Sequence, residues 1–167
     1  KFLYGFHNSK EQIRESRLAV LVEGQMDFLM SWQDGLKNAV ATSGTALTND
    51  QLTLLKRVAD QLILSFDSDV AGQNAIERSI DLVLAQDFGV KVLLVPKGKD
   101  PADLVRSDPG AMVQLAENAQ PAMAYYFGRY LGLAPASDKP KDFFKQKNNL
   151  RAVLVKIKTI NSPIEQS

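Results

Sequence analysis

The chain has 167 residues, 45% of them hydrophobic and 23% charged, which predicts one globular domain with a substantial core. No apolar run approaches the roughly 20 residues of a membrane span, no signal peptide is evident, and the absence of cysteine with a single histidine, His7, excludes a Cys/His zinc module and Cys–His catalysis. The net charge of +1 is uneven, −4 over residues 1–138 and +5 over residues 139–167, so the C-terminal stretch could contact phosphates or could be a solvated helix.

Continuous, β-rich apolar runs predict buried strands at residues 18–22, 39–42, 62–66 and 90–95. The stretches between these strands predict helices over residues 26–32, 48–60 and 71–86. Thr48 and Gln51 have the spacing of a capping box at the start of the second helix. Because strands alternate with helices, we expect right-handed crossovers and an α/β fold, a three-layer α/β/α sandwich with a mostly parallel sheet.

No strand is predicted after residue 100, and helices are expected there instead. Asp108-Pro109 and Pro121 are typical helix starts, and a last, Lys-rich helix is expected to end near residues 161–163. The expected organisation is a lead-in segment, an α/β domain and a small helical subdomain that could be truncated, over residues 1–16, 17–107 and 108–167. Because the sequence opens on Lys1 rather than methionine, we expect it to be a piece of a longer chain.

An acidic motif follows three of the predicted strands. These motifs are Glu23-Gly24-Gln25-Met26-Asp27, Asp67-Ser68-Asp69 and Lys97-Gly98-Lys99-Asp100-Pro101-Ala102-Asp103. Ligands of open parallel sheets bind at the carboxyl ends of the strands, so three motifs in this position would converge. Carboxylates that lie close together repel each other unless a cation lies between them. The pattern therefore predicts a site for a hard metal ion.

Asp67 and Asp69 are the strongest candidate ligands in these motifs. Side chains at positions i and i+2 of an extended backbone point the same way, so both carboxylates could bind one Mg²⁺ together with substrate phosphates. Glu23 could bind a second metal ion or act as a general base in phosphoryl transfer. Two structural alternatives stay open: Asp27 could be an acid at a helix N-terminus, and the Asp67 motif could be an Asx turn with an N-cap.

Candidate phosphate ligands near these carboxylates are two glycines and two lysines, Gly24, Gly72, Lys97 and Lys99. Gly24 would provide a tight exit from its strand, Gly72 would let the backbone pass close to a ligand, and a helix that begins near Gly72 would favour phosphate. The lysines suit a polyphosphate but could also belong to a basic exposed turn, because Pro101 disfavours helix at Asp100. Thr42-Ser43-Gly44-Thr45 offers hydroxyls and N–H groups after another strand, or forms only a turn and a cap.

The Glu-Gly exit from the first strand and the Asp-x-Asp exit from a later strand resemble the TOPRIM domain, and the closer match is to bacterial DnaG-type primases. The matching motifs are Leu3-Tyr4-Gly5, Val22-Glu23-Gly24-Gln25-Met26-Asp27, Gly44-Thr45-Ala46-Leu47-Thr48, Phe66-Asp67-Ser68-Asp69-Val70-Ala71-Gly72 and Gly98-Lys99-Asp100-Pro101. The resemblance covers residues 1 to about 130. It implies that Glu23, Asp67 and Asp69 are catalytic and metal-binding, and that Asp27 and Asp100 support the metal.

Two positions depart from the pattern of this family. Gln73 stands where the family often has a basic residue after the glycine of the Asp-x-Asp motif. Some members have Asp-Pro-Asp, whereas here the second acid is Asp103, displaced by one residue. The displacement puts Asp103 in doubt as a ligand.

The resemblance implies a primase fragment that synthesises short RNA primers on single-stranded DNA from ribonucleoside triphosphates, by nucleotidyl transfer with Mg²⁺ or Mn²⁺. It also implies a replicative helicase as partner of the full-length protein and a location in the bacterial cytoplasm at the replisome. The zinc module, basic subdomain and helicase-binding domain of the family are not evident, so the fragment alone could be inactive. The alternatives are a HAD-type phosphatase with Asp67 as nucleophile, a TOPRIM nuclease and a non-enzymatic binding module.

Overall fold

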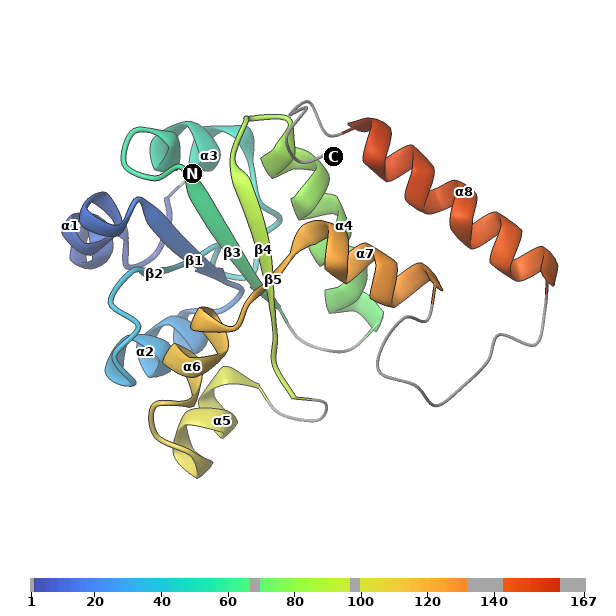
Figure 1. The fold of residues 1–167 in the computed structure, drawn as a ribbon. Helices are drawn as coiled ribbons and strands as arrows, with labels where there is room; N and C mark the ends of the chain where they lie inside the picture. Colours follow the sequence, from blue (N-terminus) through green and yellow to red (C-terminus); the bar gives the residue numbers. More distant parts are fainter. Residues whose placement is uncertain (1, 67–69, 97–99, 132–142, 160–167) are drawn as a thin grey trace.

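Residues 2–66, 70–96, 100–131 and 143–159 are described by the computed structural model of this chain, shown as a ribbon in Figure 1. Their strands are β1 (Leu18–Val22), β2 (Ala39–Ala41), β3 (Gln61–Phe66), β4 (Gly89–Leu94) and β5 (Gln120–Pro121). These strands form one sheet in the order β2-β1-β3-β4-β5. β1 to β4 run parallel to one another, and β5 pairs antiparallel with β4. The prediction of a mostly parallel sheet is confirmed, with the four parallel strands where the sequence places them.

The strand β5 was not predicted, because no strand was expected after residue 100. It consists of Gln120 and Pro121, opposite Val92 and Lys91 of β4. A proline has no N–H to donate to a neighbouring strand and is confined to sheet edges, so composition does not mark this segment as a strand. This segment is a strand only because it pairs with the edge of β4.

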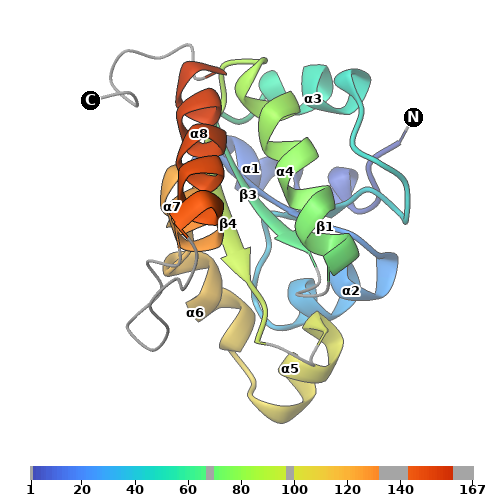
Figure 2. The same ribbon diagram turned by 90° about the vertical axis from the view of Figure 1, so that its right-hand side faces the viewer.

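Helices cover both faces of the sheet (Figures 1 and 2). They are α1 (Phe6–Ser16), α2 (Gln25–Gln33), α3 (Asn49–Lys56), α4 (Val70–Leu84), α5 (Pro101–Ser107), α6 (Ala111–Glu117), α7 (Ala122–Leu131) and α8 (Phe143–Thr159). The helices predicted between the strands are confirmed as α2, α3 and α4, whereas α1 and α5 were not predicted. In the described parts of the chain, no helix is both long and apolar enough to cross a membrane.

Alternate residues of each strand face opposite helical layers. In β1, Ala19 and Leu21 belong to one buried cluster, and Val20 and Val22 belong to the other. The first cluster joins the sheet to α1, α3, α4 and α7, and the second joins it to α2, α5 and α6. The predicted three-layer α/β/α sandwich is confirmed. Because helices cover both faces, the strands are apolar throughout rather than alternating.

The lead-in segment before β1 packs against the α/β layers. Tyr4 forms an antiparallel bridge with Ala41 of β2, with N···O distances of 2.9 and 3.0 Å. The Tyr4 ring meets the Phe28 ring edge-on, with the centroids 5.3 Å apart. Gly5 has a φ of +77°, and a Cβ atom there would lie 2.1 Å from the Phe28 ring, so glycine is required. The conformation of this segment therefore depends on contacts with α2 and β2.

The exposed turn expected at Asp100-Pro101 is the start of α5. Asp100 has an extended backbone, and its Oδ1 atom accepts the N–H of Asp103 at 2.6 Å. Proline disfavours helical backbone only at the residue before it, and proline itself suits the first turn of a helix. The division of the chain at residue 107 stays a prediction. Ala111 and Met112 of α6 are buried in the same cluster as residues of α2 and α5.

Asp34, at the end of α2, caps the distant helix α6. Its Oδ1 atom accepts the N–H of Gly110, and its Oδ2 atom accepts the N–H of Met112 at 2.9 Å. The first N–H groups of a helix have no partner inside that helix, so they need an acceptor from elsewhere. Asp34 supplies it from 76 residues away in the sequence.

We expect Asp34→Ala to lower the free energy of unfolding by about 1–2 kcal/mol, because both amides lose their acceptor. Gln114→Ala, at an exposed position of α6, is the matched control and should change the free energy of unfolding by less than about 0.5 kcal/mol. Urea unfolding followed by circular dichroism checks both values. Equal losses in the two variants would contradict the capping role.

The helix α7 brings three tyrosines to the first buried cluster. Tyr125 and Tyr126 are buried, and Tyr130 is partly buried. Burial raises the pKa of each of these phenols above its ordinary value. The carboxylate of Asp81 raises the pKa of Tyr126 further, and the carboxylate of Glu77 does the same for Tyr130. The protonated hydroxyls donate hydrogen bonds to these carboxylates.

These pKa shifts predict a loss of stability in alkali. An unfolded chain releases tyrosine protons near the ordinary pKa of about 10, whereas the folded chain retains them to higher pH. The stabilising contribution is complete below the unfolded pKa and is lost as pH rises through the folded pKa. Tyrosinate absorbance should therefore rise later in the folded chain than in urea, and Tyr126→Phe should remove part of the delayed rise. Coincident titration curves would contradict the prediction.

Candidate metal centre at the carboxyl ends of the strands

The carboxyl ends of the four parallel strands lie at one edge of the sheet (Figure 1). Leu21 of β1 lies opposite Leu64 of β3 in the strand register. Glu23 comes two residues after Leu21, and Phe66 comes two residues after Leu64, so the chain leaves both strands at the same level. Asp67 follows Phe66 directly in the sequence, so the prediction that the first two acidic motifs converge is compatible with this register.

The loop after β2 fixes the backbone of Glu23. The carbonyl oxygen of Glu23 accepts the N–H of Gly44 at 3.1 Å and the hydroxyl of Thr42 at 3.3 Å. Gly44 has a φ of +70°, which favours glycine, and the hydroxyl of Thr45 donates to the carbonyl of Thr42 at 2.9 Å. The side chain of Glu23 is exposed at this edge. Thr42 and Gly44 therefore position the backbone of Glu23. The sequence had left two roles open for residues 42–45, as ligand-binding groups or as a turn and a cap.

Asp27 caps α2 from inside the first turn of this helix. Its Oδ2 atom accepts the N–H of Gly24 at 2.9 Å, which is the one half of a capping box that a glycine N-cap allows. A Cβ atom on residue 24 would lie 2.9 Å from the same oxygen, so glycine permits this tight exit from β1. The structure thus confirms Asp27 as an acid at a helix N-terminus, and its support of a metal ion stays a prediction.

The other predicted site residues lie after β3 and β4 or in the helices that follow these strands. Asp67, Asp69, Lys97 and Lys99 lie outside the described residues. Gly72 lies in the first turn of α4, and its contact with phosphate stays a prediction. The exposed Asp100 caps α5. Among the residues that are described, no three His, Cys, Asp or Glu side chains lie close enough together to hold a metal ion.

The donor atoms at this edge fit a hard cation. Glu23 is an exposed carboxylate at a strand end, and the carboxylates predicted to join it follow the neighbouring strand. Carboxylate oxygens are the ligands that Mg²⁺ and Mn²⁺ prefer, and the sequence provides no thiolate. The chemistry of the predicted ligands therefore agrees with the predicted metal.

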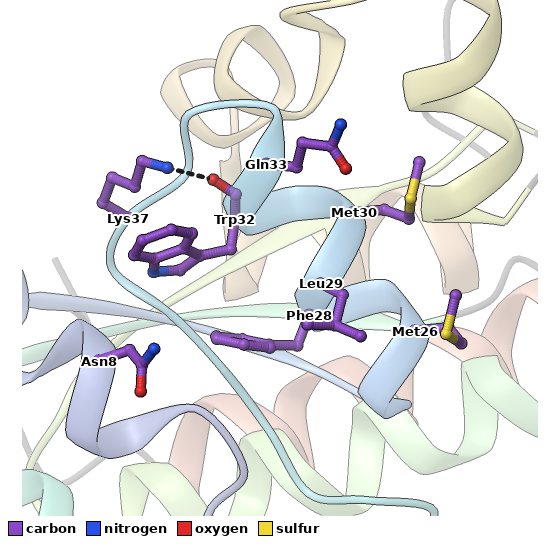
Figure 3. A pocket seen from close by; sticks show the side chains of 8 residues that line it. All are labelled: Asn8, Met26, Phe28, Leu29, Met30, Trp32, Gln33 and Lys37. Atoms are coloured by element: carbon purple, nitrogen blue, oxygen red, sulfur yellow. Dashed lines mark hydrogen bonds between the residues drawn. The ribbon is translucent and has the colours of Figure 1, made fainter.

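A pocket of about 670 Å³ lies along α2 and is lined largely by side chains of this helix (Figure 3). It is lined mainly by apolar side chains, including Met26, Phe28, Leu29, Met30 and Trp32. Lys37 Nζ donates to the carbonyl of Trp32 at 2.6 Å and lies 3.5 Å from the centroid of its ring. The pocket has no carboxylate in its lining, so it is distinct from the predicted metal centre.

Comparison with known proteins gives a family match over residues 20–105, to the model described as Toprim-like. The DNA primase of Clostridium acetobutylicum is 42% identical over 111 residues, which is 66% of this chain and 19% of that protein. The DNA primase of Enterococcus faecalis is 31% identical over 166 residues, which is 98% of this chain and 26% of that protein. The chain thus spans about a fifth to a quarter of these relatives.

Solved structures agree with the family match. A DNA primase domain from Pseudomonas aeruginosa has a TM-score of 0.80 at 28% identity, covering 99% of this chain and 52% of that one. A DnaG primase catalytic domain bound to single-stranded DNA has a TM-score of 0.79 at 26% identity, covering 98% of this chain and 53% of that one. With more than half of its length matched by the family model and with DNA primases among its relatives, the chain belongs to the Toprim-like family, and its resemblance to DnaG-type primases is confirmed.

Proposed function

We propose that this chain is the TOPRIM part of a DNA primase, which synthesises short RNA primers on single-stranded DNA during replication by metal-dependent nucleotidyl transfer. The observation that carries the proposal is the strand register, which sets Glu23 level with Phe66, the residue before Asp67. The curated relatives named above are DNA primases, which supports primer synthesis rather than phosphatase or nuclease chemistry.

In this proposal Asp67 and Asp69 hold Mg²⁺ or Mn²⁺ together with the phosphates of the incoming nucleotide. Glu23 binds a second metal ion or accepts the proton of the attacking 3′-hydroxyl. A bound metal ion would offset the negative charge that develops on the transferred phosphoryl group. Asp27 and Asp100 support the metal ions from the first turn and the N-cap of their helices.

Four residues are proposed to contact phosphates: Gly24, Gly72, Lys97 and Lys99. Gly24 and Gly72 lie at or near helix N-termini, where N–H groups favour anions. The proposed template is single-stranded DNA, which is bound in one of the similar solved structures. The proposed substrates are ribonucleoside triphosphates, and the proposed partner of the longer protein is a replicative helicase in the bacterial cytoplasm.

The experiment that tests this proposal is a Mn²⁺ soak of crystals of the chain, read by anomalous scattering. Peaks between Glu23, Asp67 and Asp69 are expected, because these carboxylates would otherwise repel one another. Carboxylates that point apart, or that only cap helices with no peak between them, would contradict the proposed metal centre. A soak with Ca²⁺, which has a longer preferred metal–oxygen distance, provides the control for specificity.

A further inference from the structure

Two carboxylates on α4 are bound by side chains from α7 and α8, and the first of them is Glu77. It accepts a hydrogen bond from the hydroxyl of Tyr130 at 2.8 Å and pairs with Arg129 Nε at 2.6 Å. The side chains of Glu77 and Arg129 are only 15% and 24% exposed. Arg129 also donates to the hydroxyl of Tyr125 at 3.3 Å. Side chains of α7 thus hold Glu77 from two directions.

Asp81 lies one helical turn beyond Glu77 and joins α4 to both other helices. Its Oδ1 atom accepts the hydroxyl of Tyr126 at 3.2 Å, and its Oδ2 atom pairs with Lys156 Nζ of α8. Positions i and i+4 share one face of a helix, so the two carboxylates form one polar strip. Figures 1 and 2 show α4, α7 and α8 on the same side of the sheet, with α7 and α8 packed together.

This polar strip gives α4 a directional restraint that apolar packing does not provide. Ile76, Ile80 and Val83 bury aliphatic side chains between α4 and the sheet, and such contacts have no strong directional preference. Partly buried ion pairs add little net stability, because desolvation offsets their attraction, but they are costly to separate. Hydrogen bonds depend on direction, so two bonded carboxylates one turn apart restrict both the rotation of α4 and its position along its axis.

The helix α4 directly follows Asp67-Ser68-Asp69 in the sequence. We infer that Glu77 and Asp81 are positioning residues for the proposed metal centre: by joining α4 to α7 and α8, they set the orientation of the first turn of α4 and thereby place the Asp67–Asp69 pair. The inference rests on the proposed function. Glu77 lies seven residues beyond Val70, about 10 Å along the helix, so it acts through α4 and not by contact with the metal.

The test compares Arg129→Met, which removes the cationic partner of Glu77 and leaves Tyr130 in place, with Arg129→Lys, which keeps the charge. Met123→Ala is the matched control, because it loosens α7 at a partly buried apolar residue without removing a partner of either carboxylate. The first readout is the set of backbone amide chemical shifts of residues 70–73, in the first turn of α4. The second readout is the Kd for Mn²⁺, which is measured from the electron paramagnetic resonance signal of free Mn²⁺.

Arg129→Met is expected to shift the amide signals of residues 70–73 and to raise the Kd for Mn²⁺ by about tenfold, with Arg129→Lys recovering part of both effects. Met123→Ala should leave both readouts near the wild-type values while lowering stability. Unchanged signals at residues 70–73 in a folded Arg129→Met chain would overturn the inference. A wild-type chain that binds no Mn²⁺ would contradict the proposed function, and the amide shifts would still decide whether the strip orients α4.

Discussion

Exchange of both Asp67 and Asp69 for asparagine should raise the Kd for Mn²⁺ by at least about tenfold, and nucleotidyl transfer should fall by about a thousandfold. Asparagine keeps the size of the side chain but removes the negative charge that attracts the cation. Titration of free Mn²⁺ by electron paramagnetic resonance measures the Kd of this chain. Primer synthesis on single-stranded DNA by a primase that contains this chain measures the transfer rate.

The control for this double exchange is Asp50→Asn. Asp50 is exposed in the first turn of α3, so its exchange makes the same chemical change on another helix. Its Kd for Mn²⁺ should equal that of the wild-type chain. If the double variant folds and binds Mn²⁺ as the wild-type chain does, the metal role of the motif is rejected. Phosphatase turnover that depends on Asp67 would instead support the HAD-type alternative.

The variant Leu64→Ala should lower the free energy of unfolding by about 2–5 kcal/mol, the largest stability effect we expect from a single substitution. Leu64 is fully buried in β3, opposite Leu21 of β1 and Val92 of β4. Removal of its side chain loses the free energy of burial and leaves a cavity that neighbouring strands cannot fill without breaking their hydrogen bonds. Chemical unfolding at constant pH measures the loss.

The matched control is Leu94→Ala, also a leucine in a parallel strand. Leu94 is 44% exposed at the end of β4, so its truncation should cost less than about 1 kcal/mol. A difference of about 2 kcal/mol or more between the two variants is expected. Similar losses would indicate that Leu64 is not part of the central core. A loss of cooperativity in Leu64→Ala alone would show that β3 organises the whole sheet.

Local patterns in the sequence were enough to predict the parallel sheet and the helices between its strands. Apolar runs such as 18–22 and 62–66 mark buried strands, because a strand covered on both faces has no polar side. The capping box at Thr48 marks the start of α3, since Thr48 N–H donates to Gln51 Oε1 at 3.0 Å. These signals come from residues that are neighbours in the sequence, so they can be recognised without the fold. Glu23 was a candidate site residue for the same reason, because it directly follows a predicted strand.

Features that join distant segments of the chain are evident only in the folded molecule. The strand β5 exists because Gln120 meets the edge of β4, and α6 is capped by Asp34 from the end of α2. The polar strip of Glu77 and Asp81 likewise needs partners that lie tens of residues later in the sequence. Such contacts leave no periodic pattern, because each depends on where the folded backbone places two remote side chains. Neighbouring residues in the sequence thus determine which helices and strands form, because capping and apolar periodicity are local. Tertiary packing determines which distant side chains cap and connect these elements.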